Sequence, residues 1–287
     1  MPLIEYTLDG KHDKVKTAIK RLQSYDPIKN GFSDKPYYGA YSGGKDSDVI
    51  RILLELSGCK HELVHNHTTV DAPETVHYVR SVSNIQINYP EMLMWRLIVK
   101  KRMPPTRIAR YCCEYLKERN GADRFVVTGV RWDESIKRKK NRSSLEVQAS
   151  KSANKLMLNS DNDEHRRQFE TCTLKGKRIN NPIIDWADAD VWEFLNHYGC
   201  KSNPLYQCGY TRVGCVGCPM AGEKGTLSEF EQYPKYKEIY IRAFGRMVTA
   251  RLESGLPTAW ENGEDVFNWW VHRKNQDKNI EGQISLL

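Results

Sequence analysis

The chain has 287 residues, enough for one full core with an appendage or for two small domains. With 28% charged and 39% hydrophobic residues it has a globular composition, and no apolar run approaches the roughly 18 residues of a membrane span. The composition therefore predicts a soluble globular protein, and the net charge of +8 suits a polyanionic ligand such as a nucleotide or a nucleic acid.

The N-terminus and the cysteine usage predict a cytoplasmic location. The first residues, M-P-L-I-E-Y-T-L-D-G, lack the basic and apolar segments of an export signal. In a reducing compartment the eight cysteines are expected to be thiols or metal ligands and not disulfides.

Helical and strand patterns alternate along the chain. In chain order, the expected elements are a helix at Lys11–Tyr25, a strand ending near Tyr41, a helix around Val49–Leu56, a strand around Leu63-Val64, a helix beginning near Pro73, a strand around Ile85–Ile87, helices at Met92–Val99 and Thr106–Asn120, strands at Phe125–Val127 and Pro182–Trp186, and a helix at Asp188–Tyr198. Strands separated by helices predict an α/β protein with a doubly wound, mainly parallel sheet.

The same patterns predict the domain organisation. We expect an N-terminal helix within 1–35, a sheet domain at 36–199, and at 200–287 a cysteine- and glycine-rich loop followed by helices. The segment 137–181 is polar and weakly periodic, so it is interpreted as an insertion whose basic start, K-R-K-K-N-R, is exposed.

The stretch Tyr38–Ser47, Y-G-A-Y-S-G-G-K-D-S, has the features of an anion-binding turn. Its glycines let the backbone approach an anion, which the N–H groups and dipole of the following helix then hold. Lys45 adds a point charge suited to a phosphate. The pattern G-x-x-x-x-G-K-S/T is absent, so this is not a Walker A loop. An ordinary glycine turn is the alternative interpretation.

The cysteines form two pairs that favour a metal site. Cys112 and Cys113 are adjacent, and Cys215 and Cys218 form a C-x-x-C turn that aims both sulfurs at one centre. A 4Fe–4S cluster spreads its irons far enough apart for neighbouring cysteines each to ligate a different one. Structural zinc and unrelated buried thiols are the alternatives, and Cys208 is an alternative ligand that could replace one member of the tandem pair.

These motifs resemble those of a known superfamily. S-G-G-K-D-S resembles the PP-loop of ATP pyrophosphatases, and C-C followed by C-x-x-C is similar to the cluster motif of adenylylsulfate (APS) reductases, relatives of the PAPS reductases. Further similar fragments are P-E-T from Pro73, T-G-V-R from Thr128 and D-V-W from Asp190. The resemblance covers roughly residues 36 to 220 and implies an adenine nucleotide alpha-hydrolase-like PP-loop fold.

The resemblance also implies the site residues. Those that would contact the nucleotide are Ser42, Gly43, Gly44, Lys45, Asp46, Ser47, Thr68, Gly129 and Arg131, with Lys45 and Asp46 as catalytic residues. Mg²⁺ would bridge the phosphates of ATP, with Asp46 or Asp48 as a ligand. The 4Fe–4S ligands would be Cys112, Cys113, Cys215 and Cys218. For Arg131 the alternative is an ion pair with Glu134 or another acid.

One family feature is missing from the sequence. Reductases of this family carry a catalytic cysteine in a C-terminal E-C-G-I/L-H motif, whereas here no cysteine follows Cys218. The chain therefore resembles the ATP pyrophosphatases of DNA phosphorothioation (Dnd and Ssp type) and the cluster-dependent tRNA thiolases. This predicts adenylation of a substrate by ATP for sulfur transfer, with a nucleic acid as the acceptor and a cysteine desulfurase as the sulfur donor. A PAPS or APS reductase that uses Cys208 and a non-enzymatic component of an assembly are the alternatives.

Overall fold

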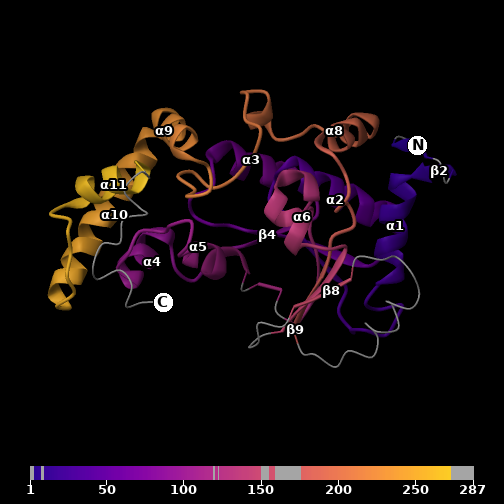
Figure 1. Ribbon diagram of the computed structural model, residues 1–287, viewed down its shortest axis with the longest axis horizontal. Helices are drawn as coiled ribbons and strands as arrows, with labels where there is room; N and C mark the ends of the chain where they lie inside the picture. Colours follow the sequence, from indigo (N-terminus) through magenta and orange to yellow (C-terminus); the bar gives the residue numbers. More distant parts are fainter. Residues whose placement is uncertain are drawn as a thin grey trace. The chain divides into compact units, whose positions relative to one another are not determined.

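The computed structural model describes residues 3–7, 10–118, 120–121, 123–149, 155–158 and 176–272. It divides the chain into two compact units (Figure 1). Unit 1 consists of Met1–Asn66, Pro73–Asn88 and Asn120–Val213, and unit 2 of His67–Ala72, Tyr89–Arg119 and Gly214–Leu287. The division expected from the sequence was continuous, whereas unit 2 combines the C-terminal part of the chain with two segments from its middle.

Unit 1 is built on a seven-stranded sheet with the order β5-β4-β3-β6-β9-β7-β8. The parallel strands are β3 (Tyr37–Ala40), β4 (His61–Asn66), β5 (Ile85–Asn88), β6 (Phe125–Val127) and β9 (Gly176–Asn180). The two antiparallel strands are β7 (Leu145–Ala149) and β8 (Lys155–Leu158). The strand order reverses at β3, as in a doubly wound sheet, so the predicted fold class is confirmed.

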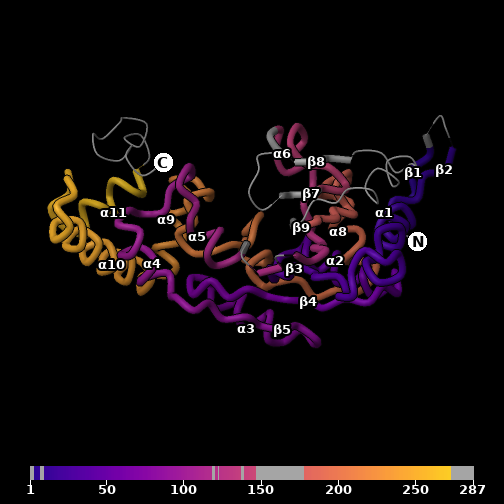
Figure 2. The backbone as a smooth tube through the Cα atoms, turned by 90° about the horizontal axis from the view of Figure 1, so that it is seen from below, coloured from indigo at the N-terminus to yellow at the C-terminus, as the bar shows by residue number. Residues whose placement is uncertain are grey.

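Three helices of unit 1 cover one face of this sheet. The helices of the unit are α1 (Lys14–Ser24), α2 (Lys45–Ser57), α3 (Pro73–Ser81), α6 (Ile136–Asn141) and α8 (Asp188–His197). The buried faces of α1, α2 and α8 pack with Tyr37 of β3 and Phe125 of β6 in one apolar core, and α1 lies beside α2 (Figure 2). A hairpin of β1 (Ile4–Thr7) and β2 (Gly10–Asp13) precedes α1 and was not predicted from the sequence.

Unit 2 is helical. Its elements are α4 (Met94–Lys101), α5 (Tyr111–Cys113), a π-helical turn η1 (Glu114–Glu118), α9 (Glu223–Gln232), α10 (Pro234–Glu253) and α11 (Gly263–Val271). The long helix α10 packs against α4, α9 and α11. Phe230, Tyr240 and Trp270 pack their rings in tilted and edge-on pairs between these helices, with centroids 4.9 Å to 6.0 Å apart. Proline at the first position of α10 separates it from α9.

Two predicted elements are wrong. The strand expected at Pro182–Trp186 is a series of turns, in which Ile184 N donates to Asn181 O and Trp186 N to Ile183 O. Proline has no N–H for a sheet ladder, and the real strand, β9, ends two residues before Pro182. The helix expected at Thr106–Asn120 begins only at Tyr111, because the Thr106 hydroxyl accepts from Ala109 N and closes a separate turn.

The polar insertion contains regular structure. Within 137–181 lie part of α6 and the strands β7, β8 and β9, so this segment adds strands to the sheet of unit 1. Cys172 and the C-terminal segment Asn279–Leu287 lie outside the described residues. In the part of the chain that the structure covers, no helix has the length and apolar character needed to cross a membrane.

Candidate functional site

The turn between β3 and α2 is held by its own residues. Gly43 has a φ of +75°, and a Cβ atom there would lie 2.8 Å from Val79 Cγ2, so only glycine fits. Gly44 caps α2, and its N–H donates to Ser47 Oγ at 3.1 Å while that hydroxyl donates to Gly44 O at 2.7 Å. Ser42 Oγ lies 3.4 Å from the same hydroxyl. This tight turn therefore presents the N-terminus of a 13-residue helix.

Lys45, the first residue of α2, is surrounded by partners from a later part of unit 1. Its backbone N–H donates to Tyr206 Oη at 2.9 Å. Its ammonium lies 3.1 Å from Asp188 Oδ1, 3.3 Å from Thr211 O and 5.6 Å from the centroid of the Tyr206 ring. The ammonium is buried at the helix end, where a phosphate would be expected to bind.

Arg131 joins the start of α2 to the start of α8. Its Nε donates to Asp46 Oδ1 at 2.6 Å, and a terminal nitrogen donates to Asp188 Oδ1 at 2.9 Å. The side chain is only 2% exposed. The alternative that Arg131 pairs with an acid therefore holds, and the acids that its side chain contacts are Asp46, Asp188 and, at 3.6 Å, Asp133. Glu134 accepts a bond from the Arg131 backbone. Contact of Arg131 with a nucleotide stays a prediction.

Gly129 allows the loop after β6 to approach α2. A Cβ atom on Gly129 would lie 2.9 Å from the backbone oxygen of Asp46, closer than a methyl group tolerates. The two loops follow β3 and β6, the neighbouring parallel strands at which the strand order reverses. In open α/β sheets, ligands bind outside the carboxyl ends of the strands at such a reversal. The predicted site residues of unit 1 therefore meet where this fold binds ligands.

Asp48 is not available as a magnesium ligand. Its side chain is 0% exposed, and its two oxygens accept hydrogen bonds from Tyr41 Oη at 2.6 Å and Tyr78 Oη at 2.9 Å. Burial raises the pKa of this carboxyl from 3.8 to about 6. Asp46, the other candidate ligand, is engaged by Arg131.

Thr68 belongs to unit 2, whereas the loop residues belong to unit 1. Its N–H donates to Asp71 Oδ2 at 2.7 Å, and its hydroxyl lies 3.4 Å from Cys215 Sγ. The structure therefore groups Thr68 with the cysteines, and its contact with a nucleotide remains a prediction.

The four cysteines predicted as ligands all belong to unit 2, whereas Cys208 is exposed on unit 1. The Cys112 thiol hydrogen-bonds to Cys113 and interacts electrostatically with Cys215 and Cys218. Among the described residues, no three His, Cys, Asp or Glu side chains are gathered closely enough to hold one metal ion. Four thiolates on one zinc ion would lie about 3.8 Å apart, whereas a cubane cluster holds its ligands farther apart. The cluster and the zinc alternative therefore both stay predictions.

The C-x-x-C turn rests on the aromatic core of unit 2. Gly217 has a φ of +70°, and a Cβ there would lie 2.7 Å from the Phe230 ring and 3.0 Å from Trp270. Tyr240 Oη donates to Val216 O at 3.0 Å. Burial raises the pKa of Cys215 to about 11. Two thiol pairs beside an apolar wall are a donor set suited to an iron–sulfur cluster.

Several residues of the site were not found from the sequence. Tyr206 and Thr211 contact Lys45 from positions 161 and 166 residues further along the chain. Asp188 lies in the first turn of α8. Acids are common there because they interact favourably with the helix dipole, so its position in the sequence did not indicate a role in the site. Lys117 interacts electrostatically with Cys215, Cys113 and Cys218, which raises its pKa.

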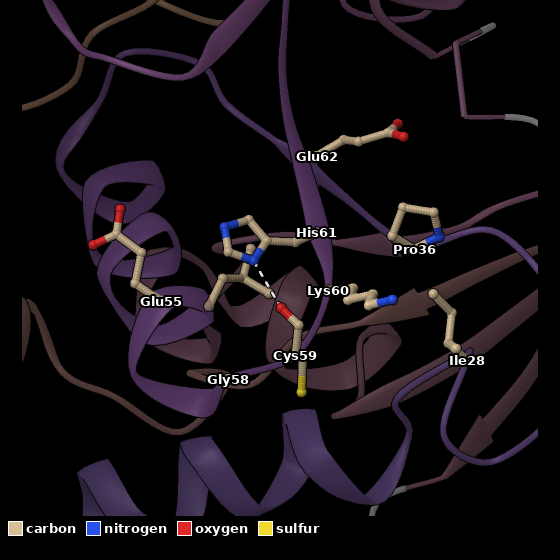
Figure 3. Close-up of a pocket in the computed structure, with 9 residues that line it drawn as sticks. Ile28, Pro36, Glu55, Gly58, Cys59, Lys60, His61 and Glu62 are labelled. Carbon is tan, nitrogen blue, oxygen red and sulfur yellow. Dashed lines mark hydrogen bonds between the residues drawn. The ribbon is translucent and has the colours of Figure 1, made fainter.

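A separate cavity of about 670 Å³ lies at the other end of the sheet (Figure 3). It is lined by Pro36, Lys60 and Glu62, which lie around the amino-terminal ends of β3 and β4. His61 Nδ1 lies 2.9 Å from Cys59 O across its floor. Because ligands of this fold bind at the carboxyl ends, we do not assign the nucleotide to this cavity.

The fold and the loop after β3 define a nucleotide-binding α/β domain. Residues 36–221 match the phosphoadenosine phosphosulfate reductase domain, and the chain belongs to that family.

Similar proteins cover the chain to different extents. An uncharacterised protein of Methanocaldococcus jannaschii is 27% identical over 75% of this chain and 42% of its own length. The adenosine 5'-phosphosulfate reductase of Allochromatium vinosum is 42% identical over 41 residues, which are 14% of this chain and 16% of that enzyme. The phosphoadenylyl-sulfate reductase structure from Candida auris has a TM-score of 0.44 and 15% identity, covering 74% of this chain and 97% of that one. The chain spans about half the length of the first curated relatives, from 42% to 54%.

Proposed function

We propose that the chain is an ATP pyrophosphatase that adenylates a substrate for sulfur transfer. The observation that carries this proposal is the buried Lys45 ammonium at the N-terminus of α2, on a turn held by Ser47. A lysine and a helix N-terminus at the carboxyl end of β3 are suited to a polyphosphate.

The reaction requires charge neutralisation and positioning. An oxygen of the substrate attacks the α-phosphorus of ATP, the bond to the β-phosphate oxygen breaks, and pyrophosphate leaves with the electron pair. A sulfur nucleophile then displaces AMP. Lys45 would neutralise the phosphates, and the N–H groups at the start of α2 would orient them. Asp46, held by Arg131, is near enough to the same helix end to take part in binding Mg²⁺.

The second site is proposed to hold a 4Fe–4S cluster. Cys112, Cys113, Cys215 and Cys218 would be its ligands, and Lys117 would offset the negative charge of the thiolates. Such a cluster supplies a sulfur-ligated redox or sulfur-binding centre. A cytoplasmic location is proposed with it, because a reducing compartment keeps cysteines available as cluster ligands.

A nucleic acid is the proposed acceptor, and a basic segment of unit 2 supports it. Residues 92–113 contain six basic residues and no acid. The six basic residues are Arg96, Lys100, Lys101, Arg102, Arg107 and Arg110. All of them except Lys101 are exposed. Ile108 in the same segment is 82% exposed. An acid-free basic surface attracts the phosphates of a nucleic acid. A cysteine desulfurase is the proposed sulfur donor.

The proposal is tested with radiolabelled ATP and the full chain. Calorimetry should detect MgATP binding, and pyrophosphate should be released when the acceptor nucleic acid and a sulfur donor are present. A chain that binds no ATP under any of these conditions would refute the proposal. Release of sulfite from PAPS would instead support the reductase alternative. Binding of ATP without turnover, with every component supplied, would favour the non-enzymatic alternative.

A further inference from the structure

The groups that would hold phosphates in unit 1 already have partners within the same unit. Lys45 N donates to Tyr206 Oη at 2.9 Å, and Lys45 Nζ donates to Thr211 O at 3.3 Å. Tyr206 and Thr211 lie in the segment 203–213, which we call the strap. We propose that the strap is an internal ligand of the phosphate-binding loop and that a polyphosphate must displace Tyr206 to bind. This inference rests on the proposed ATP binding.

The strap is anchored on the loop at its first residue. Asn203 is fully buried, and its Nδ2 donates to Gly43 O at 3.0 Å and to Thr75 Oγ1 at 3.1 Å. Asn203 Oδ1 accepts from Leu205 N and starts the 3-10 turn η3 (Pro204–Tyr206). The anchor uses a carbonyl of the loop and none of its donors. It can therefore stay in place while the rest of the strap moves.

Tyr206 occupies the position of an anion. Its hydroxyl accepts from the first N–H of α2, one of the groups that a helix leaves without an intrahelical partner. A Cβ atom on Gly44 would lie 3.2 Å from the same hydroxyl, so the phenol lies directly over the glycine turn. One N–H cannot donate well to the phenol and to a phosphate oxygen at once. A phosphate oxygen is the stronger acceptor because it is charged.

The phenol can leave without changing its charge. Burial raises the pKa of Tyr206 to about 12, so the hydroxyl is neutral at pH 7 to 8. The ring packs edge-on against Trp192 at 5.1 Å, and Cys208 N and Gly209 N donate to Leu205 O and Tyr206 O in turns of the strap. The strap bonds to the loop through Asn203, Tyr206 and Thr211.

The substitution Tyr206→Phe distinguishes competition with a phosphate from direct binding of a phosphate by Tyr206. If Tyr206 donated its O–H to a bound phosphate, the variant Tyr206→Phe would weaken phosphate binding. If Tyr206 competes with the phosphate, the same variant should strengthen binding, because phenylalanine keeps the ring against Trp192 and removes only the acceptor. Loss of one neutral hydrogen bond corresponds to about a fivefold change in affinity.

The experiment measures binding of MgATP and of inorganic pyrophosphate to the full chain by calorimetry. Tyr206→Phe should bind both about fivefold more tightly than the wild type. Tyr198→Phe is the matched control, because it also removes one phenol hydroxyl, from a ring that packs on Phe194 of α8. This variant should bind both ligands with the affinity of the wild type. Equal or weaker binding by Tyr206→Phe overturns the strap proposal.

Hydrogen exchange of the wild type supplies a second measurement. Saturating MgATP should accelerate exchange at the amides of 205–211 and slow it at the start of α2. Slower exchange in the strap would mean that it closes over the ligand, and this would overturn the proposal. Absence of binding in the wild type and in both variants overturns the proposed function together with the strap. Binding by the wild type without a gain in Tyr206→Phe overturns the strap alone.

Discussion

Asp188 connects the two cations of the candidate nucleotide site. Its carboxylate is half-exposed, yet one oxygen lies within 3.1 Å of both Lys45 Nζ and a terminal nitrogen of Arg131. Burial opposes the charge of this carboxylate, but the two cations outweigh it and lower the pKa of Asp188. Lys45 and Arg131 are therefore each paired with an acid of unit 1 before any ligand binds. A nucleotide would have to replace a carboxylate as the counterion of Lys45.

Replacing Lys45 tests the phosphate site. Lys45→Ala should weaken MgATP binding by about 10- to 100-fold, because a hydrogen bond to a charged group contributes about 1.5–3 kcal/mol. Calorimetry measures the affinity, and circular dichroism checks the fold. Lys139→Ala, on the exposed end of α6, is the control with the same loss of charge. Unchanged ATP affinity in Lys45→Ala would remove the loop after β3 from the site.

The buried Asp48 predicts a pH-dependent stability. The pKa of its carboxyl is about 6 in the folded chain and near 3.8 when unfolded. As pH rises between these values, the unfolded state loses its proton first, so the stability due to the protonated carboxyl decreases. Relative to Asp48→Asn, the wild type should lose about 1 kcal/mol of unfolding free energy between pH 5 and 7. Urea unfolding at both pH values measures this, and parallel pH profiles of the two proteins would contradict it.

The loop residues were predicted from the sequence because they are contiguous. Ser42 to Ser47 carry the glycine turn, the lysine and the start of the helix in one segment, so the local pattern determines the local structure. The side-chain pairing of Arg131 with Asp46 joins residues 85 positions apart and has no local signal. The hydrogen bond between Lys45 and Tyr206 joins residues 161 positions apart. It depends on where the strap packs on the loop, which no local pattern indicates.

At the scale of elements, helices with a clear apolar face were predicted well, and irregular segments were not. Leu22 and the other buried residues of α1 recur at helical spacing, and α1 lies within the predicted range. The segment after Pro105 is also rich in helix formers, yet a turn closed by Thr106 delays the helix to Tyr111. The hydrogen bond to the Thr106 hydroxyl forms in the folded chain, but the amino-acid pattern of this segment does not reveal it.

The C-x-x-C turn predicts where the metal binds. Anaerobically purified protein should be brown and contain about four irons per chain, as a cubane cluster requires. Cys215→Ser and Cys218→Ser should each lose most of this iron, because each removes a ligand from the turn on the aromatic core. Iron analysis and visible absorption measure the result.

Cys208→Ser is the control for the cluster, because Cys208 is exposed and belongs to unit 1. Its iron content should equal that of the wild type. Zinc in place of iron under anaerobic conditions would contradict the cluster. If Cys113→Ser kept its iron and Cys208→Ser lost it, Cys208 and not Cys113 would be the fourth ligand.

At the scale of the whole molecule, the sequence predicted the sheet but not the division of the chain. Unit 2 takes Tyr89–Arg119 from between β5 and β6 and joins it to the C-terminal helices. The packing of α4 on α10 joins segments more than 130 residues apart, and no periodicity within either helix reveals it. Because of this division, the tandem pair and the C-x-x-C turn lie in the same unit.

The basic segment predicts salt-dependent nucleic-acid binding. Lys100→Ala with Arg107→Ala should reduce the slope of log affinity against log salt by about 2, because each phosphate contact contributes about one unit. Fluorescence anisotropy of a labelled oligonucleotide measures this. Lys139→Ala with Lys140→Ala removes the same charge from two exposed lysines of α6 and should leave the slope nearly unchanged. If the two double variants changed the slope equally, the basic segment would contribute only through the net charge of the protein and would not be the binding surface.

The final prediction separates sulfur insertion from sulfonucleotide reduction. A reductase must form a covalent thiosulfonate on a cysteine, and no cysteine follows Cys218 in this sequence. The four cysteines of unit 2 would be committed to iron, and Cys59 is buried with its pKa raised to about 11 by that burial. Cys200 is half-buried, and burial raises the pKa of its thiol. Cys208, on the strap, is exposed, so it is the candidate for such a step.

We therefore expect no sulfite from APS or PAPS in the presence of thioredoxin, and pyrophosphate from ATP once acceptor and sulfur donor are supplied. Sulfite and pyrophosphate are assayed on the same cluster-loaded preparation, with Cys208→Ser in parallel. Sulfite formation by the wild type that Cys208→Ser abolishes, at unchanged iron content, would make the strap cysteine a nucleophile and the chain a reductase. Since Cys208 follows Tyr206 by two residues, displacement of the strap by a nucleotide would then also move the nucleophile.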